Sequence, residues 1–241
     1  MKTICIIPAR GGSKGLPRKN VLPLAGRPLI TWPIAAALES GICDAIFVTT
    51  DDEEIADVAR SAGAQVPFLR PPRYAEDLTT TEDTLQQALL SYEEHMGFNY
   101  DIGVFLTPTD VFRKPAWIHD AVDRLMQQRD LESVFSAHET HKNYWHKTND
   151  GNWERVLPWM KEYSSRQTRR KIYREDTGLA CASRAVLWRE GRRIGDKVSL
   201  ITNENPETAI DIHTEFDLFI AEKAIEYLKK YQPERLPFNL G

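Results

Sequence analysis

The sequence predicts an α/β protein with a mainly parallel central sheet, because strand-like and helix-like segments alternate along its 241 residues. Short apolar runs at 4–7 and 102–106 are typical of buried strands. Helix-like segments between such runs stop at glycines, as at Gly41 and Gly63. The length suits one α/β domain, and no repeat or long linker divides the chain, so we expect a single domain over residues 1–241.

The same reading gives the expected elements in order. Strands are expected at 4–7, 45–50, 65–69, 102–106, 133–137, 178–183, 198–202 and 207–211. Helices are expected at 28–40, 53–62 (with Asp52 as its cap), from 79–84 to about 95, 115–129 and 214–231. Residues 138–177 break the alternation, since they are aromatic and basic without a clear period. We interpret this stretch as a β-rich insertion or arm that reaches a partner subunit.

Charge and cysteine content narrow the class of protein. A net charge of −4 argues against a general nucleic-acid binder, which is usually basic. The cations concentrate at 10–19 and 166–174, which favours a site for an anionic small molecule, although the second cluster is also compatible with a solvated helix face. Cys5, Cys43 and Cys181 are widely spaced, so neither a disulfide framework nor a zinc site is indicated. With no signal peptide or membrane-length apolar run, we expect a cytoplasmic protein.

The loop after the first expected strand carries the strongest functional signal. Gly11, Gly12 and Gly15 permit positive φ and a close approach of the backbone to a ligand, and successive N–H groups in such a loop bind anions. The loop also holds four cations: Arg10, Lys14, Arg18 and Lys19. Neither Gly-x-x-x-x-Gly-Lys-Ser/Thr nor Gly-x-Gly-x-x-Gly is present. The loop therefore indicates a polyphosphate site of another type, with a solvated basic turn as the alternative.

Ligands of open α/β sheets bind beyond the carboxyl ends of the strands. The loops expected to meet there are 8–20, 49–52, 70–84, 107–113 and 211–217.

Residues 8–20 (Pro-Ala-Arg-Gly-Gly-Ser-Lys-Gly-Leu-Pro-Arg-Lys-Asn), followed by Leu-Ala-Gly-Arg-Pro-Leu-Ile at 24–30, resemble the acylneuraminate cytidylyltransferases, or CMP-sialic acid synthetases. Weaker matches follow in the order of that family, at 48–51, 69–71, 77, 108–109, 165–167, 192–195 and 210–218. The resemblance spans nearly the whole chain. It implies one glycosyltransferase-A-like, Rossmann-like three-layer sandwich, which assembles as a homodimer.

The resemblance also implies a reaction. Members of the family transfer CMP from CTP to the anomeric hydroxyl of a nine-carbon 2-keto sugar acid, with Mg²⁺, and release pyrophosphate. Arg10 and Lys19 would neutralise charge at the α-phosphate and the leaving pyrophosphate. Backbone N–H groups of 11–14 would hold the β- and γ-phosphates. The other nucleotide-binding residues implied are Ala9, Gly11, Gly12, Ser13, Lys14, Asn20, Arg70, and Thr80 or Thr81.

On the acceptor side, the resemblance assigns Arg166 to the sugar acid, since a guanidinium fork suits a carboxylate, with an ordinary surface arginine as the alternative. Tyr173 and Trp145 are candidate walls of the sugar pocket or packing residues. Thr107 stands where the family usually has the glutamine that contacts the acid, and 110–112 and 174–178 also depart from its pattern. We expect these departures to indicate a relative of sialic acid, such as a legionaminate-like, pseudaminate-like or deaminated sugar.

Asp211 matches the family's metal-binding aspartate, and carboxylates suit Mg²⁺. The family commonly has Asp-x-Asp here, whereas this chain has Asp211-Ile212-His213, and histidine is a poor ligand for Mg²⁺. The second ligand is thus open among His213, Asp217 and Asp110, and Asp217 is also typical of a first helical turn.

Three other functions remain open on the sequence. An eight-carbon 3-deoxy-manno-octulosonate cytidylyltransferase and an aldose 1-phosphate nucleotidyltransferase would each have a different loop after the first strand. A non-catalytic nucleotide- or sugar-binding relative has little need of Arg10, Lys14, Lys19 and Asp211 together.

Overall fold

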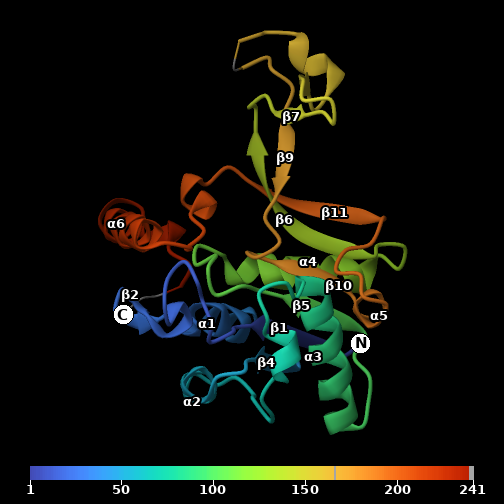
Figure 1. Cartoon of the computed structure of the whole chain (residues 1–241), viewed down its shortest axis with the longest axis vertical. Helices are drawn as coiled ribbons and strands as arrows, with labels where there is room; N and C mark the ends of the chain where they lie inside the picture. The colour runs from blue at the N-terminus through green and yellow to red at the C-terminus, as the bar shows by residue number, and fades with distance from the viewer. Residues whose placement is uncertain (166, 239–241) are drawn as a thin grey trace.

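A seven-stranded mixed sheet forms the centre of the computed structural model, which describes residues 1–165 and 167–238 (Figure 1). Six strands follow the order β11-β6-β10-β5-β1-β4, and β9 pairs with β6. Their bounds are β1 Thr3–Pro8, β4 Ala45–Thr49, β5 Ile102–Phe105, β6 Ser133–Thr140, β9 Ile172–Glu175, β10 Cys181–Arg184 and β11 Val198–Asn203. Strand β1 runs parallel to β4 and β5, and β6 runs parallel to β11, whereas β10 is antiparallel to both of its neighbours. The prediction of an α/β fold with a mainly parallel sheet is confirmed.

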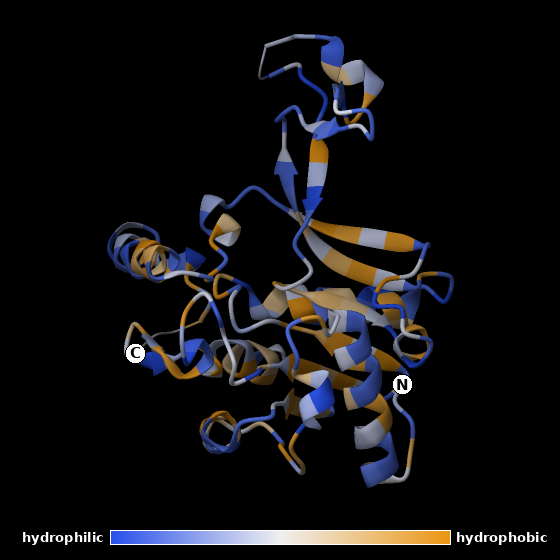
Figure 2. Ribbon diagram, viewed as in Figure 1, coloured by the Kyte–Doolittle hydropathy of each residue, from blue (hydrophilic) through white to orange (hydrophobic). Residues whose placement is uncertain are grey.

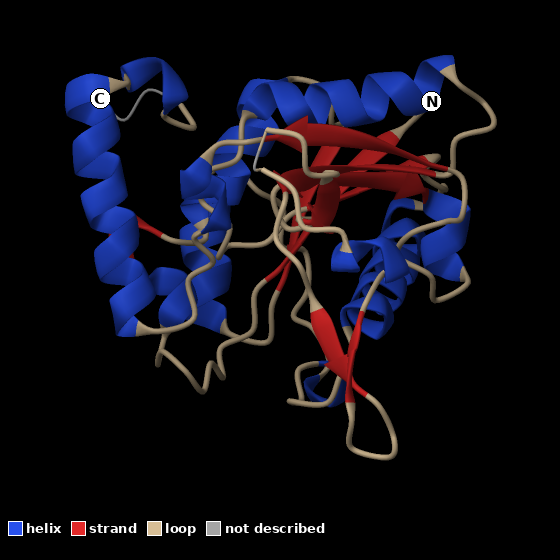
Figure 3. Cartoon of the chain, turned by 90° about the horizontal axis from the view of Figure 1, so that it is seen from above, coloured by secondary structure: helices blue, strands red, loops and turns tan. Residues whose placement is uncertain are grey.

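Five of the six described α-helices cover the two faces of the sheet and make three layers with it, and α6 lies to the side (Figure 3). The helices are α1 Thr31–Ser40, α2 Glu53–Ser61, α3 Thr81–Met96, α4 Pro115–Gln127, α5 Ala185–Arg189 and α6 Glu215–Tyr231. Side chains of β1 alternate between the two faces: Cys5 and Ile7 join one core cluster with α1, α2 and α4, and Ile4 and Ile6 join another with α3 and α5. Helix α6 packs on a third cluster that includes Trp32. Figure 2 shows the hydrophobic residues concentrated along the strands and the inward sides of the helices.

Two expected strands are absent from the described residues. At 65–69, Gln65 forms only an isolated bridge with Phe47, and Pro67 has no N–H group to extend the ladder. At 207–211, the chain instead forms a 3₁₀ helix over Pro206–Ala209, which begins with a proline at its first position. Helix α5 was not expected. The antiparallel β10 follows from the chain returning to the sheet after its excursion through 138–177.

Residues 138–165 and 167–177 form a β-rich projection, which we call the arm (Figure 1). Its base is the antiparallel pair of β6 and β9, and beyond it lie the hairpin β7 Trp145–Lys147 with β8 Trp153–Arg155 and a 3₁₀ helix over Pro158–Lys161. The arm exposes several aromatic side chains: Tyr144, Trp145, Trp153, Tyr163 and Tyr173. A second small hairpin, β2 Pro23–Leu24 with β3 Arg27–Pro28, follows the loop at 8–20. Among the described helices, none has the length and apolar character needed to cross a membrane.

Candidate active site

Two adjoining cavities lie at the carboxyl ends of β1 and β5. The first, which we call the loop cavity, has a volume of about 440 Å³ and is lined by the loop at 8–20 and by residues of 70–84. The second, the Asp110 cavity, has a volume of about 500 Å³ and lies between 107–110, 174–178 and 208–213. Five residues line both: Thr81, Phe105, Thr107, Thr109 and His213. The structure therefore offers two ligand spaces with a shared boundary, as a reaction between two substrates requires.

Arg10 and Lys14 line the loop cavity, and both form ion pairs with Asp77. The Arg10 contact is 3.0 Å long, and the Lys14 hydrogen bond is the largest factor holding the pKa of Asp77 below its usual value. Sequence reasoning noted Asp77 only as part of the resemblance. The structure shows it as the counter-charge of the loop's cations.

Two glycines of the loop, Gly11 and Gly15, serve close packing rather than positive φ. None of Gly11, Gly12 and Gly15 has positive φ, contrary to one of the two expected uses. A Cβ on Gly11 would lie 2.8 Å from Asp52 Oδ2, and one on Gly15 would lie 2.6 Å from the His213 carbonyl oxygen. These glycines let the loop approach the 211–217 segment and the end of β4.

Part of the loop's hydrogen-bonding capacity is used within the protein. The Gly11 N–H donates to Asp51 Oδ1 at 2.9 Å, and the Ser13 N–H donates to the Gly11 carbonyl at 3.1 Å. Ala9 is buried, and its N–H donates to the Thr49 carbonyl, so it holds the loop from behind. Ser13 itself lines the cavity. A phosphate cradle of N–H groups at 11–14 therefore requires Gly11 and Ser13 to exchange these partners.

Lys19 is the most desolvated cation of the loop. Its Nζ donates to the Ile212 carbonyl at 3.1 Å, and burial lowers its pKa. Asn20 lies beside it with its side-chain amide donating to the Arg10 carbonyl at 2.9 Å. Arg18, by contrast, turns away from the cavity and pairs with Asp52 and Glu54. Three of the four loop cations thus line the cavity.

The predicted base and ribose residues hold the protein's own backbone in place. Arg70 is buried and donates to the carbonyls of Thr49 and Tyr74, and burial lowers its pKa to about 10. Thr80 caps α3 by accepting a hydrogen bond from the Asp83 N–H at 3.0 Å. Arg70, Thr80 and Thr81 all line the loop cavity, so their role in nucleotide binding stays a prediction.

Asp110 is a partly buried carboxyl group in the wall of the second cavity. Burial, with a smaller contribution from the charge of Asp211, raises the pKa of Asp110 to about 6. Thr107 Oγ1 donates to Asp110 Oδ2 at 2.5 Å. Gly178 makes room for this carboxylate, because a Cβ there would lie 1.9 Å from Asp110 Oδ2. The departures at 107–113 and 174–178 therefore meet at one place in the structure.

A buried arginine, Arg113, holds the backbone of the two segments at 107–113 and 174–178 together. Arg113 is fully buried, and its guanidinium donates to the carbonyls of Thr107 and Gly178 and, at 3.0 Å, to that of Leu179. Burial lowers its pKa to about 10. Sequence reasoning did not single out this residue, because a buried arginine that binds only carbonyl groups has no local signature.

The two aspartates of the 211–217 segment have different surroundings. Asp211 lines the Asp110 cavity, and its Oδ2 lies 2.7 Å from His213 Nε2. Asp217 instead completes the capping box of α6, accepting hydrogen bonds from the N–H groups of His213 and Thr214. The structure therefore does not favour Asp217 as a metal ligand. Within residues 1–165 and 167–238, no three His, Cys, Asp or Glu side chains are grouped as a metal centre.

Two residues predicted to bind the sugar lie outside both cavities. Tyr173 is on β9 with its hydroxyl 3.5 Å from Glu139, and Trp145 is on the β7–β8 hairpin with Arg155 over its ring. Both are on the arm, whose extension from the sheet carries them away from this chain's own cavities. Arg166, the predicted partner of the sugar acid, lies outside the described residues. Thr107 does lie at the boundary of the two cavities.

A cationic loop cavity at the carboxyl ends of an α/β sheet, next to a second polar cavity, fits the class of nucleotidyltransferases. The cytidylyltransferase family model matches residues 4–236, and the chain belongs to that family. It is 32% identical over 228 residues to CMP-N,N'-diacetyllegionaminic acid synthase of Legionella pneumophila, covering 94% of this chain and 97% of that protein. The N-acylneuraminate cytidylyltransferase of Streptococcus agalactiae is 41% identical over 145 residues, 59% of this chain and 33% of that protein.

The fold is shared with solved structures of low sequence identity. CMP:2-keto-3-deoxy-manno-octonic acid synthetase, in complex with CTP, superposes with a TM-score of 0.68 at 15% identity, over 94% of this chain and 99% of that one. This likeness shows the three-layer Rossmann-like fold that the resemblance implied.

Proposed function

We propose that the chain transfers CMP from CTP to the anomeric hydroxyl of a nine-carbon 2-keto sugar acid and releases pyrophosphate. The observation that carries this proposal is the pair of cavities with five shared lining residues, one cavity rich in cations and the other in carboxylates. The full-length similarity to a CMP-legionaminic acid synthase supports a nine-carbon acceptor.

In this reaction, the anomeric oxygen bonds to the α-phosphorus and gives up its proton, while the bond from the α-phosphorus to pyrophosphate breaks. Such a transfer depends on positioning and charge neutralisation. Arg10 and Lys19 line the loop cavity and would neutralise the phosphate charge from that side. Arg10 and Lys14 form ion pairs with Asp77, and a bound triphosphate would replace Asp77 as their partner.

The acidic residues also fit a magnesium ion. The charge of Asp211 is close enough to raise the pKa of Asp110, and two neighbouring carboxylates suit a hard cation that keeps water and phosphate ligands. Asp211 would hold the ion, with Asp110 beside it. When bound, the ion would offset charge on the triphosphate. Substrate phosphates and water would supply the remaining ligands.

We also propose a homodimer formed through the arm and an enzyme that works in a reducing cytoplasm. Exposed aromatic side chains on the arm support the first proposal, since a large exposed apolar surface is typical of an interface. The free, buried thiols of Cys5 and Cys181 are consistent with the second.

Pyrophosphate release tests the function directly. The chain is incubated with CTP and, one at a time, N,N'-diacetyllegionaminic, pseudaminic, N-acetylneuraminic and 3-deoxy-manno-octulosonic acids, with and without Mg²⁺. We expect release with at least one nine-carbon acid, dependent on Mg²⁺, and formation of the CMP-sugar acid. Turnover with the eight-carbon acid alone would contradict the proposed acceptor, and CTP binding without any turnover would contradict the reaction.

A further inference from the structure

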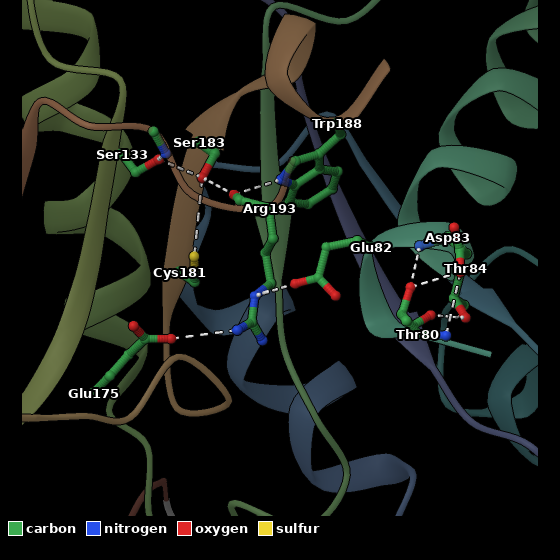
Figure 4. A network of polar contacts seen from close by, with 11 residues as sticks. Thr80, Glu82, Asp83, Thr84, Ser133, Glu175, Cys181, Ser183, Trp188 and Arg193 are labelled. Carbon is green, nitrogen blue, oxygen red and sulfur yellow. Dashed lines mark hydrogen bonds and ion pairs between the residues drawn. The ribbon is translucent and has the colours of Figure 1, made fainter. Parts of the chain in front are cut away.

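Arg193 is a cation at the wall of the Asp110 cavity, on the connection between α5 and β11. Its backbone is fixed, because its carbonyl accepts hydrogen bonds from Ser183 Oγ at 2.7 Å and Trp188 Nε1 at 3.1 Å (Figure 4). Its guanidinium reaches toward the cavity between Glu82 and Glu175.

The guanidinium of Arg193 is only loosely held. Its contacts to Glu82 and Glu175 are both 3.3 Å long, and its buried Nε–H has no hydrogen bond of good geometry. Both glutamate side chains are more than a third exposed, so these pairs are weak and the glutamates are free to turn to solvent.

The other arginine of this cavity makes a useful contrast. Arg174 is bound in a two-point pair to Asp176, at 2.8 Å from Nε to Oδ1 and 3.0 Å from Nη2 to Oδ2. The Nε and Nη2 donors of the Arg174 guanidinium are therefore already bound to Asp176. Of the two arginines that the structure describes in the lining of this cavity, Arg193 has the donors left for a ligand.

The position of Arg193 fits the chemistry of the acceptor. In a cyclic 2-keto acid, the carboxylate and the reacting hydroxyl share the anomeric carbon, so the carboxylate has to lie beside the boundary with the nucleotide. The Arg193 guanidinium lies over the ring of Phe105, a boundary residue, with 5.5 Å to the ring centroid. It also contacts Glu82, the neighbour of the boundary residue Thr81.

We propose that Arg193 binds the carboxylate of the acceptor and so selects 2-keto sugar acids; this inference rests on the proposed function. The Arg193 fork exchanges its long contacts to Glu82 and Glu175 for a two-point pair with the incoming carboxylate, which is the geometry in which arginine binds this group most strongly.

The test compares Arg193→Gln with the wild type on two probes, N,N'-diacetyllegionaminic acid or N-acetylneuraminic acid and the carboxamide of the same sugar. We expect the wild type to prefer the acid by about 10- to 100-fold in kcat/KM, and Arg193→Gln to lose most of this preference while its affinity for CTP is unchanged. Arg193→Lys keeps the charge without the fork and should show an intermediate preference.

Arg192→Gln is the matched control, because the neighbouring Arg192 pairs with Asp196 and does not line the cavity. A purely structural role for Arg193 would lower thermal stability and the rates with both probes alike, leaving the acid preference intact, and this result would overturn the inference. Weaker binding of CTP in Arg193→Gln would overturn it too, by assigning the residue to phosphate.

Failure of the proposed function would be distinguishable, since the wild type would release no pyrophosphate with any acid. In that case, calorimetric binding of the two acids to the wild type and to Arg193→Gln still tests the carboxylate contact. Equal binding to both proteins would reject it.

Discussion

Lys19, in the loop at 8–20, lies half-buried against the 211–217 segment, and its Nζ donates to the Ile212 carbonyl. A desolvated ammonium neutralises a nearby phosphate more strongly than one in water. We therefore expect Lys19→Ala to lower kcat by about 100- to 1000-fold with little change in thermal stability. Pyrophosphate release and a melting curve measure the two effects.

Lys14 and Lys229 provide the controls for this change. Lys14 is three-quarters exposed, so Lys14→Ala should cost much less than Lys19→Ala, and Lys229→Ala on the outer side of α6 should cost nothing. Comparable activity in Lys19→Ala and Lys229→Ala would show that Lys19 has no role in transfer.

Asp110 is the residue at which pH should act on stability. Its pKa of about 6 in the folded chain lies above the ordinary value of 3.8, so the folded state binds the proton more tightly than the unfolded state does. Stability must then fall as pH rises between these two values, and the loss is complete above about pH 7. Asp110→Asn removes this loss and keeps an oxygen acceptor for the Thr107 hydroxyl.

We expect Asp110→Asn, without CTP or Mg²⁺, to melt a few degrees higher than the wild type at about pH 8 and to keep only about half of that advantage at about pH 5. Scanning fluorimetry at the two pH values measures it. A constant difference at both values would show that packing rather than charge is responsible.

At the scale of elements, the capping box of α6 links the helix to the site. Asp217 accepts hydrogen bonds from the Thr214 hydroxyl and from the N–H groups of His213 and Thr214, and these bonds lower the pKa of Asp217 and fix the turn that follows Asp211. A cap contributes about 1 kcal/mol to stability. Asp217 therefore has a structural function that the spacing of acidic residues alone does not reveal.

We expect Asp217→Asn to lower the melting temperature slightly and to leave the Mg²⁺ concentration for half-maximal rate unchanged. Asp211→Asn should instead raise that concentration by about tenfold or more, because it removes the proposed ligand. Titration of Mg²⁺ in the pyrophosphate assay distinguishes them. A large shift in Asp217→Asn would restore Asp217 as a ligand.

The sequence was sufficient for elements whose signals are local. The periodic helices and the buried strands β1, β4 and β5 follow from apolar pattern and glycine stops, and the site loops converge where parallel topology puts them. It failed at 65–69, where Pro67 cannot extend a ladder, and at 207–211, where Pro206 begins a 3₁₀ helix in place of the expected strand.

The missing parts of the site depend on long-range contacts. Asp77 meets Arg10 across 67 positions of the sequence, and Arg193, which the sequence marked only as part of the weak match at 192–195, contacts Glu82 and Glu175 through the tertiary fold. Loop glycines at 11 and 15 were recognised as important, yet their neighbours in space, Asp52 and the His213 carbonyl, are set only by the tertiary fold.

At the scale of the whole molecule, the arm stands out because it buries few side chains of its own and exposes several aromatic ones. Trp153 and Tyr163 are 65% and 70% exposed, on a hairpin and loop that extend away from the sheet. In water, such residues are costly unless a second surface covers them. A homodimer that packs its arms against the neighbouring subunit would bury them.

We expect Trp153→Glu with Tyr163→Glu to convert the proposed dimer to a monomer that keeps its melting transition, as measured by light scattering after size exclusion and by scanning fluorimetry. A charge placed in a buried apolar interface is strongly unfavourable, whereas the same charge on an exposed arm is not.

Tyr231→Glu is the control, because Tyr231 belongs to a second group of exposed aromatic residues, on α6. Dissociation by Tyr231→Glu but not by the arm variant would move the interface to α6, and a monomeric wild type would refute the dimer. If the arm variant is a folded monomer that has lost turnover with the sugar acid but still binds CTP, the acceptor side of the site depends on the partner subunit.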